Sequence, residues 1–430
     1  MTDVRGIAVA RRNEIFIQSL FALAIVLFIA IGTGISVFSY IALALSAGCL
    51  VLASNERAFG FMFFLLPFAN VFKADSHSTS FFTYLTILLI VKLFVSKRWI
   101  GKRFMGAVLL LLVVQLIGSC MDYTILIKQA MILLLIYGYF HCCEPITEAL
   151  TLHLTGGLCI SCCLSYMTAI FPGISEYMRT VRAYEVSAEL FRFTGLYSDP
   201  NYLSQVLILL CVALFILIQR KRIGRWYWAI CLLCVFWGLR TISKTFFFML
   251  VIIAVMLFVF AVKYRRYGIL FFLTAGAAFF LIFAKDLSVV ASIIKRLVSG
   301  DISTGRFSIW GQYAVYLIKH PLRLLFGAGI AADPLGYLPH STYLDFLYYY
   351  GIFGTLVFAV GFCYAVRGKL KKAGILNCVP VICFSILGAV LSNLLMYDFG
   401  YLLIFIMAFL TEDERKGLVM NDDQCDRSRI

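Results

Sequence analysis

Residues 200–218 read PNYLSQVLILLCVALFILI, an apolar run of 19 residues without a charged side chain. A helix of this length rises about 28 Å, close to the thickness of the hydrocarbon core of a bilayer. Asp199 immediately precedes the run, and a basic cluster begins just after it at Arg220. Asp199 is suited to cap a helix whose first residue is Pro200. The stretch therefore predicts a transmembrane helix with a defined start.

The composition of the whole chain agrees with this interpretation. Of 430 residues, 62% are hydrophobic and only 14% are charged, whereas a soluble domain usually has about a quarter charged residues. The mean hydropathy is +0.95. These values exclude an ordinary cytosolic enzyme, a disordered chain and a secreted disulfide scaffold. We expect an all-α fold, a polytopic transmembrane helical bundle that forms one integral membrane domain over residues 1–430.

Apolar runs long enough to span a bilayer recur along the chain, and we expect about twelve to fourteen transmembrane helices. The candidate spans are residues 15–31, 35–52, 58–72, 81–95, 104–118, 124–140, 149–171, 200–218, 226–239, 245–262, 268–284, 341–366, 374–393 and 397–411.

Basic residues give the orientation of the chain. Lys and Arg number 37 against 22 Asp and Glu, a formal net charge of +15. With the spans above, the basic clusters at 5–12, 97–103, 220–225, 263–266 and 367–372 all fall on one side. Positive residues collect in cytoplasmic loops and against anionic lipid headgroups, so we expect cytoplasmic N- and C-termini and membrane lipids as partners. Nucleic acid is not expected as a partner.

The cysteines do not indicate disulfides or metal. Nearly all of the 14 Cys lie inside apolar runs. Cys159 and Cys162 have the spacing of zinc ligands, but they lie in an apolar stretch without a second pair. We interpret them as small packing residues and expect no metal and no cofactor.

Two segments on the predicted outer side are long. A smaller loop covers residues 172–199, and a large loop covers residues 285–340 and carries the candidate active site. The large loop has apolar residues at helical spacing in two stretches, the second over 309–317, with Asp301 or Ser303 as its candidate N-cap. We therefore expect a small helical cap on the outer surface of the membrane.

The first group of candidate site residues surrounds the start of the span at 200. Arg192 precedes the cap by one loop turn, and its guanidinium is always charged and can bind phosphate with two donors. Backbone amides at the helix start would add to an anion site. The alternative is that Asp199, Pro200 and Asn201 only start a span that enters the membrane from outside.

The second group belongs to the large loop and its end. Arg306 lies in the first turn of the predicted outer helix, with Trp310 one turn later, where the alternative is an arginine that reaches lipid headgroups. His340 lies where the chain re-enters the membrane. Its ordinary pKa near 6.5 suits a proton acceptor at neutral pH, although a lone His is usually only a polar interface residue.

In this order the residues resemble a family. The series Arg192, Asp199-Pro200-Asn201, Gly305-Arg306, Trp310, Pro321, Gly327-x-Gly329, His340 and Gly351-x-x-Gly354 resembles the superfamily of O-antigen ligases and surface polysaccharide polymerases. The similarity covers roughly residues 192–354. Two positions depart from the family pattern: Lys244 stands where the family often has Arg, and Ser341 where it often has Asn. Lys keeps the charge but loses the two-donor geometry.

The resemblance implies an inverting, metal-independent glycosyltransferase of the bacterial inner membrane whose site faces outward. The donor would be a glycan on undecaprenyl diphosphate, and the acceptor another glycan. Arg192 and Arg306, assisted by Lys244, would bind the diphosphate, and His340 would accept the proton of the attacking hydroxyl. A chain-length regulator would be an optional protein partner.

The resemblance leaves two products open within the family, and one other class remains as a rival. A polymerase joins repeat units to one another, and a ligase moves the finished glycan to a lipid A core or other surface acceptor. The number of spans favours a polymerase. A transporter or lipid-linked glycan flippase would instead place ionisable groups near the membrane midplane.

Overall fold

The computed structural model describes residues 18–75, 77–96, 104, 106, 108–110, 113, 123–144, 146–177, 181–182, 191–263, 305–329, 335–336, 338–370 and 375–411. Most of these residues are helical, which confirms the predicted all-α class. The strands of the described part are two residues each, β1 (Val181–Arg182) and β2 (Phe191–Arg192), and they pair antiparallel.

Helices in the first half of the chain are mostly 11 to 20 residues long. They cover Gln18–Gly32, α2 (Ser36–Leu52), α3 (Asn55–Leu65), the 3₁₀ turn η1 (Leu66–Phe68), α4 (Phe81–Ser96), α6 (Tyr123–Cys142), α7 (Thr147–Leu164) and α8 (Pro172–Tyr177).

The second half continues in the same way. Its helices are α9 (Pro200–Gln219), α10 (Tyr227–Arg240), α11 (Lys244–Lys263), α14 (Arg306–Lys319), α15 (Pro321–Phe326), α16 (Thr342–Asp345), the π-helical turn η3 (Phe346–Tyr350), α17 (Gly351–Val366), α18 (Ile375–Val390) and α19 (Phe399–Thr411).

Four helices are long and apolar enough to cross a membrane: Thr124–Cys142, Thr147–Leu164, Pro200–Gln219 and Thr342–Val366. Seven further helices of the described part are apolar but shorter. Large apolar side chains are exposed on their outward faces, among them Val95, which is 74% exposed, and Val255, which is 56% exposed. Such faces suit contact with lipid rather than water. The total of about twelve to fourteen spans stays a prediction.

Two predicted spans end earlier than hydropathy suggests. The run at 58–72 is interrupted because α3 gives way to the 3₁₀ turn that contains Pro67, which cannot continue an α-helix. The run at 149–171 ends its helix at Leu164, where Ser165 donates to the carbonyl of Cys162 at 2.6 Å. Hydropathy does not detect such helix ends.

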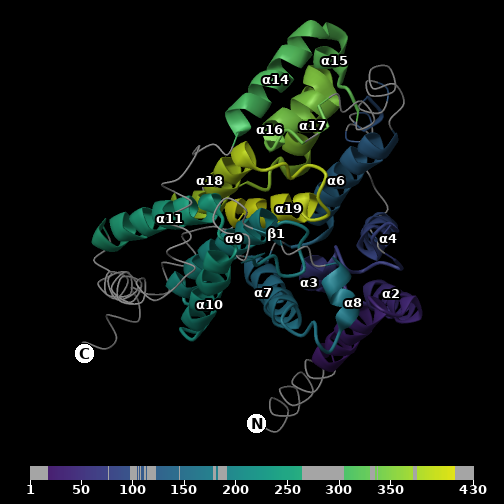
Figure 1. Ribbon diagram of the computed structural model, residues 1–430, viewed down its shortest axis with the longest axis vertical. Helices are drawn as coiled ribbons and strands as arrows, with labels where there is room; N and C mark the ends of the chain where they lie inside the picture. The colour runs from purple at the N-terminus through teal and green to yellow at the C-terminus, as the bar shows by residue number, and fades with distance from the viewer. Residues whose placement is uncertain are drawn as a thin grey trace.

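Helix α9 lies at the centre of the bundle and packs against α7, α10, α11 and α18, while α6 packs against α4, α17 and α19. The described buried apolar residues form one continuous core that extends from Ile25 to Phe409. The outer-loop helices α14 and α15 lie beside α16 and α17 (Figure 1). The chain thus places the predicted outer helix against the start of a long apolar helix.

Candidate functional site

The start of α9 has the cap that the sequence predicts. Asp199 is extended, and its Oδ1 accepts a hydrogen bond of 2.6 Å from the backbone N–H of Asn201. Pro200 occupies the first helical position, where its missing N–H removes no bond. The cap fixes the first turn, and with it the side chain of Asn201.

Arg192 lies on β2 and is only 6% exposed. Its Nε donates to the carbonyl of Thr241 at 2.8 Å, and its Nη2 donates to Oδ1 of Asn201 at 3.1 Å. The next residue, Phe193, donates its backbone N–H to the carbonyl of Arg240 at 2.9 Å. The guanidinium is therefore held in a defined plane between the end of α10 and the start of α9.

The start of α11 meets the same group. Ser243 donates its hydroxyl to Oδ1 of Asn201 at 2.8 Å and accepts the N–H of Phe246 at 3.3 Å, as the cap of α11. Lys244 is half-buried and is the first residue of α11. Two helix N-termini, each the positive end of a helix dipole, thus converge beside Arg192. This arrangement can stabilise an anion.

The predicted outer helix begins at Arg306. Its N-cap is Gly305, whose φ of 78° is left-handed, whereas the candidate caps Asp301 and Ser303 lie outside the described residues. One turn into α14, Trp310 donates its Nε1 to the carbonyl of Pro339 at 3.0 Å. This bond attaches the start of α14 to the segment that carries His340.

His340 has an unusual backbone. Its φ is 52°, in the left-handed region that non-glycine residues rarely adopt. Such a conformation costs of order 1–3 kcal/mol and often occurs at functional sites. The following Ser341 is the N-cap residue of α16; its side chain makes no capping bond, and its carbonyl accepts the first helical hydrogen bond, from the N–H of Asp345 at 2.8 Å. The side chain of His340 is exposed in this turn, at the point where the chain is predicted to re-enter the membrane.

Burial and neighbouring charges shift the pKa of His340. Partial burial and the neighbouring charge of Arg306 lower its pKa from 6.5, while Asp199 acts in the opposite direction. Because the pKa is lowered from a value already below 7, the neutral imidazole predominates at pH 7 and can accept a proton. The same interactions mean that Arg306 and Asp199 each lie within electrostatic reach of His340.

The candidate residues therefore form two linked groups. Arg192, Asp199, Pro200, Asn201 and Lys244 surround the starts of α9 and α11. Arg306, Trp310, His340 and Ser341 lie where α14 meets α16. Asp199 links the groups through its interaction with His340.

A buried polar group behind the site was not predicted. Asp345 is 1% exposed and accepts the hydroxyl of Ser392 at 2.9 Å, and Tyr202 of α9 donates to the carbonyl of Ser392 at 2.8 Å. Burying an acidic side chain in an apolar run costs free energy, and Asp345 lies in such a run one turn after Ser341. Its presence in the sequence could therefore have indicated this buried polar group. These bonds join α9, α16 and the segment after α18.

Gly327 and Gly351, two glycines of the motif series within residues 192–354, allow two backbone segments to approach closely. Ala328 donates its N–H to the carbonyl of Tyr348 at 2.7 Å. A Cβ on Gly327 (φ 93°) would lie 2.2 Å from the carbonyl oxygen of Tyr349, and a Cβ on Gly351 would lie 2.4 Å from the nitrogen of Gly327. The end of α15 thus packs backbone to backbone on η3, an approach that only glycine permits.

The chain matches no protein-family model, no curated protein and no solved structure significantly. Among the residues that the structure describes, no group of three His, Cys, Asp or Glu side chains is arranged to hold a metal ion. The chemistry of the site is therefore argued from its own residues.

Proposed function

We propose that the chain is a membrane glycosyltransferase that joins undecaprenyl-diphosphate-linked glycan units into a surface polysaccharide. We also propose that the chain is related to the superfamily that its sequence resembles and that it crosses the bacterial inner membrane about twelve to fourteen times. Its site would face outward. The observation that carries it is the convergence of two helix starts at Arg192, linked through Asp199 to the neighbouring pair of Arg306 and His340.

In the proposed reaction, a hydroxyl of the acceptor glycan attacks the anomeric carbon of the donor. The new carbon–oxygen bond forms as the bond to the diphosphate oxygen breaks on the opposite face, so the anomeric configuration inverts. The hydroxyl proton passes to the neutral imidazole of His340. The bonding electrons leave with the diphosphate, which needs no proton to depart.

The cations act on the leaving group. Negative charge grows on the bridging oxygen as the glycosidic bond breaks, and fixed positive groups stabilise it without reorganisation. Arg192 is already oriented by Thr241 and Asn201, and Arg306 lies within electrostatic reach of the proposed proton acceptor His340. Lys244 adds charge without two-donor geometry. Side chains of the protein alone supply this stabilisation, so the proposed reaction is metal-independent.

The decisive experiment uses the purified full chain in nanodiscs with lipid-linked repeat units. A ladder of glycan lengths that persists in EDTA is the expected result, and its loss in Arg306→Ala assigns the activity to the site. Transfer only to an added lipid A core acceptor would instead identify a ligase. Movement of intact lipid-linked units without any new glycosidic bond would identify a flippase and contradict the proposal.

A further inference from the structure

A second site lies on the predicted outer side, apart from the residues used so far. It is a cavity of about 670 Å³ between the connection that precedes α4, the first turns of α4 and α6, and the segment that leads into α19. We call it the outer cavity, lined among others by Ser78, Thr83, Lys128, Met131, Tyr397 and Tyr401. Its volume is in the range of sites for small organic ligands, about 300–1,000 Å³.

Hydroxyl groups are the main polar feature of the outer cavity. Thr86 donates to the carbonyl of Phe82 at 2.9 Å, and it therefore accepts the hydroxyl of Tyr401, also at 2.9 Å. Thr79 and Thr83 lie on the same wall, and their hydroxyls have no hydrogen bond to any residue that the structure describes. These groups can both donate and accept, as the hydroxyls of a sugar do.

The charges do not favour a strongly anionic ligand. Lys73 and Lys128 line the cavity, but Asp398 is buried close enough to Lys128 to interact with its charge. In the loop that carries Lys73, Asp75 accepts the backbone N–H groups of His77 at 2.9 Å and Ser78 at 2.8 Å. The charge of Lys128 is thus offset by Asp398, and the loop of Lys73 also carries an acidic residue, which favours a polar rather than a strongly anionic ligand.

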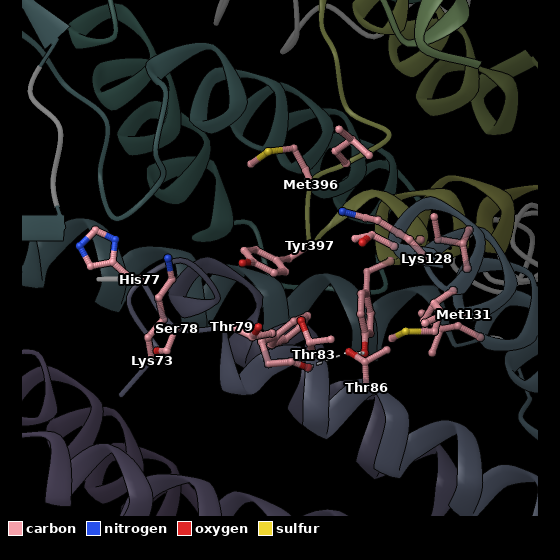
Figure 2. A pocket seen from close by; sticks show the side chains of 18 residues that line it. Lys73, His77, Ser78, Thr79, Thr83, Thr86, Lys128, Met131, Met396 and Tyr397 are labelled. Atoms are coloured by element: carbon pink, nitrogen blue, oxygen red, sulfur yellow. Dashed lines mark hydrogen bonds between the residues drawn. The ribbon is translucent and has the colours of Figure 1, made fainter. Parts of the chain in front are cut away.

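The shape fits an extended ligand. Lys73, His77 and Ser78 lie at one end of the outer cavity and Lys128 and Met131 at the other, with Tyr397 between them (Figure 2). The Nζ of Lys128 lies 5.8 Å from the centre of the Tyr397 ring. An aromatic ring amid scattered hydroxyls suits a sugar chain, whose rings have apolar C–H faces and polar edges.

A short segment connects the outer cavity to the candidate site. Residues 391–398 join α18 to α19. Ser392, at one end of this segment, bonds Asp345 behind the candidate site, whereas Met396 and Tyr397 line the outer cavity and also border a small hollow beside Ser198, next to Asp199. The two sites therefore share one structural element.

We infer that the outer cavity binds the glycan of the acceptor substrate, an inference that rests on the proposed function. A transferase that joins two glycans needs a second place for the chain that attacks. The arginine-bearing site holds the donor diphosphate, and the outer cavity holds several sugar units of the acceptor while its terminal hydroxyl reaches His340.

Binding tests the inference directly. The probe is the repeat-unit oligosaccharide released by mild acid from the host's own lipid-linked precursor. Its affinity for the full chain in nanodiscs is measured by saturation-transfer NMR. Thr83→Trp fills the cavity, Thr83→Val removes only the hydroxyl, and Tyr84→Trp is the matched control because Tyr84 is the next residue of α4, does not line the cavity and is 50% exposed.

The expected result is a loss of affinity of tenfold or more in Thr83→Trp, a smaller loss in Thr83→Val and no change in Tyr84→Trp. Equal affinity in all four proteins overturns the inference. A second outcome also overturns it: Thr83→Trp loses co-purified phospholipid, or loses binding of inorganic phosphate, but still binds the oligosaccharide. The cavity would then hold a lipid phosphate and not a glycan.

Polymerisation kinetics separate the two proposals. If the wild type makes polymer and Thr83→Trp raises the KM for the acceptor with little change in kcat, both stand. If the wild type makes polymer and Thr83→Trp has unchanged KM, the acceptor assignment fails while the enzyme proposal stands. If oligosaccharide binding depends on Thr83 but no polymer forms, the glycan site stands and the proposed reaction fails.

Discussion

Arg192 and Asn201 are joined by a hydrogen bond of 3.1 Å between Nη2 and Oδ1. The same oxygen of Asn201 accepts the hydroxyl of Ser243, which caps α11. One amide oxygen therefore positions the guanidinium relative to two helix starts. The orientation of the Arg192 side chain depends on the planar shape of its guanidinium. A substitution that keeps the charge but changes the shape can therefore test the two properties separately.

Arg192→Lys is expected to retain normal protein levels and to lose about 100-fold or more in turnover. An ammonium keeps the charge but cannot bond Thr241, Asn201 and a phosphate in one plane. The measurement is polymer formation by purified protein at saturating donor. Arg225→Lys is the control, since Arg225 is exposed in a predicted cytoplasmic loop. Wild-type turnover in Arg192→Lys would count against diphosphate binding by this residue.

His340→Ala and Arg306→Ala are each expected to abolish long-chain glycan in cells without lowering the amount of membrane-inserted protein. The first removes the proposed proton acceptor, and the second removes a cation that we propose stabilises the leaving group. Glycan length on gels is the readout. His320→Ala and Arg323→Ala are matched controls in the same outer segment. Normal chain length in both test variants would remove the catalytic assignment.

The pH dependence should follow His340. Its pKa is lowered by burial and by Arg306, so the neutral form that we propose as active predominates at pH 7, and activity is expected to fall as the pH drops through a midpoint below 6.5. Arg306→Gln removes a charge that opposes protonation and should move this midpoint upward. Asp199→Asn removes a charge that favours protonation and should move it downward. NMR titration of the His340 imidazole measures both shifts without activity, and shifts of the opposite sign would contradict the assigned neighbours.

Gly327→Ala should detach α15 from η3. The new Cβ would meet the carbonyl oxygen of Tyr349 at 2.2 Å, so the backbones must separate. Gly336→Ala is the control, because its φ of 72° is also left-handed but its Cβ would meet no atom of the described residues within 4 Å, which leaves a cost of only about 1–2 kcal/mol. Thermal unfolding in detergent should show the larger loss for Gly327→Ala, together with lost polymer formation. Equal stability would contradict the close approach.

The orientation is checked by cysteine labelling in whole cells. Ser308→Cys should react with a membrane-impermeant maleimide from outside, and Arg222→Cys only after permeabilisation. The wild-type chain, which contains native cysteines, gives the background. The reverse pattern would invert the predicted topology and move the site to the cytoplasm.

Local chemistry explains which features the sequence predicted. The Asp199–Pro200 helix start and the outer helix near Arg306 were predicted because caps and hydrophobic spacing act over a few residues. The strand pair at Arg192, the backbone contact of Gly327 with η3 and the outer cavity were not predicted. The strand pair is local, but its two-residue strands are too short for a hydrophobic alternation to indicate them. The contact of Gly327 with η3 and the outer cavity join segments that lie apart in the chain, and the outer cavity combines side chains from Lys73 to Tyr401 without any local pattern.

The bond from Trp310 to the carbonyl of Pro339 joins the helix that carries Arg306 to the residue before His340. This single bond ties the placement of the proposed cation to that of the proposed proton acceptor. A change that shifts one of the two groups is therefore expected to shift the other as well.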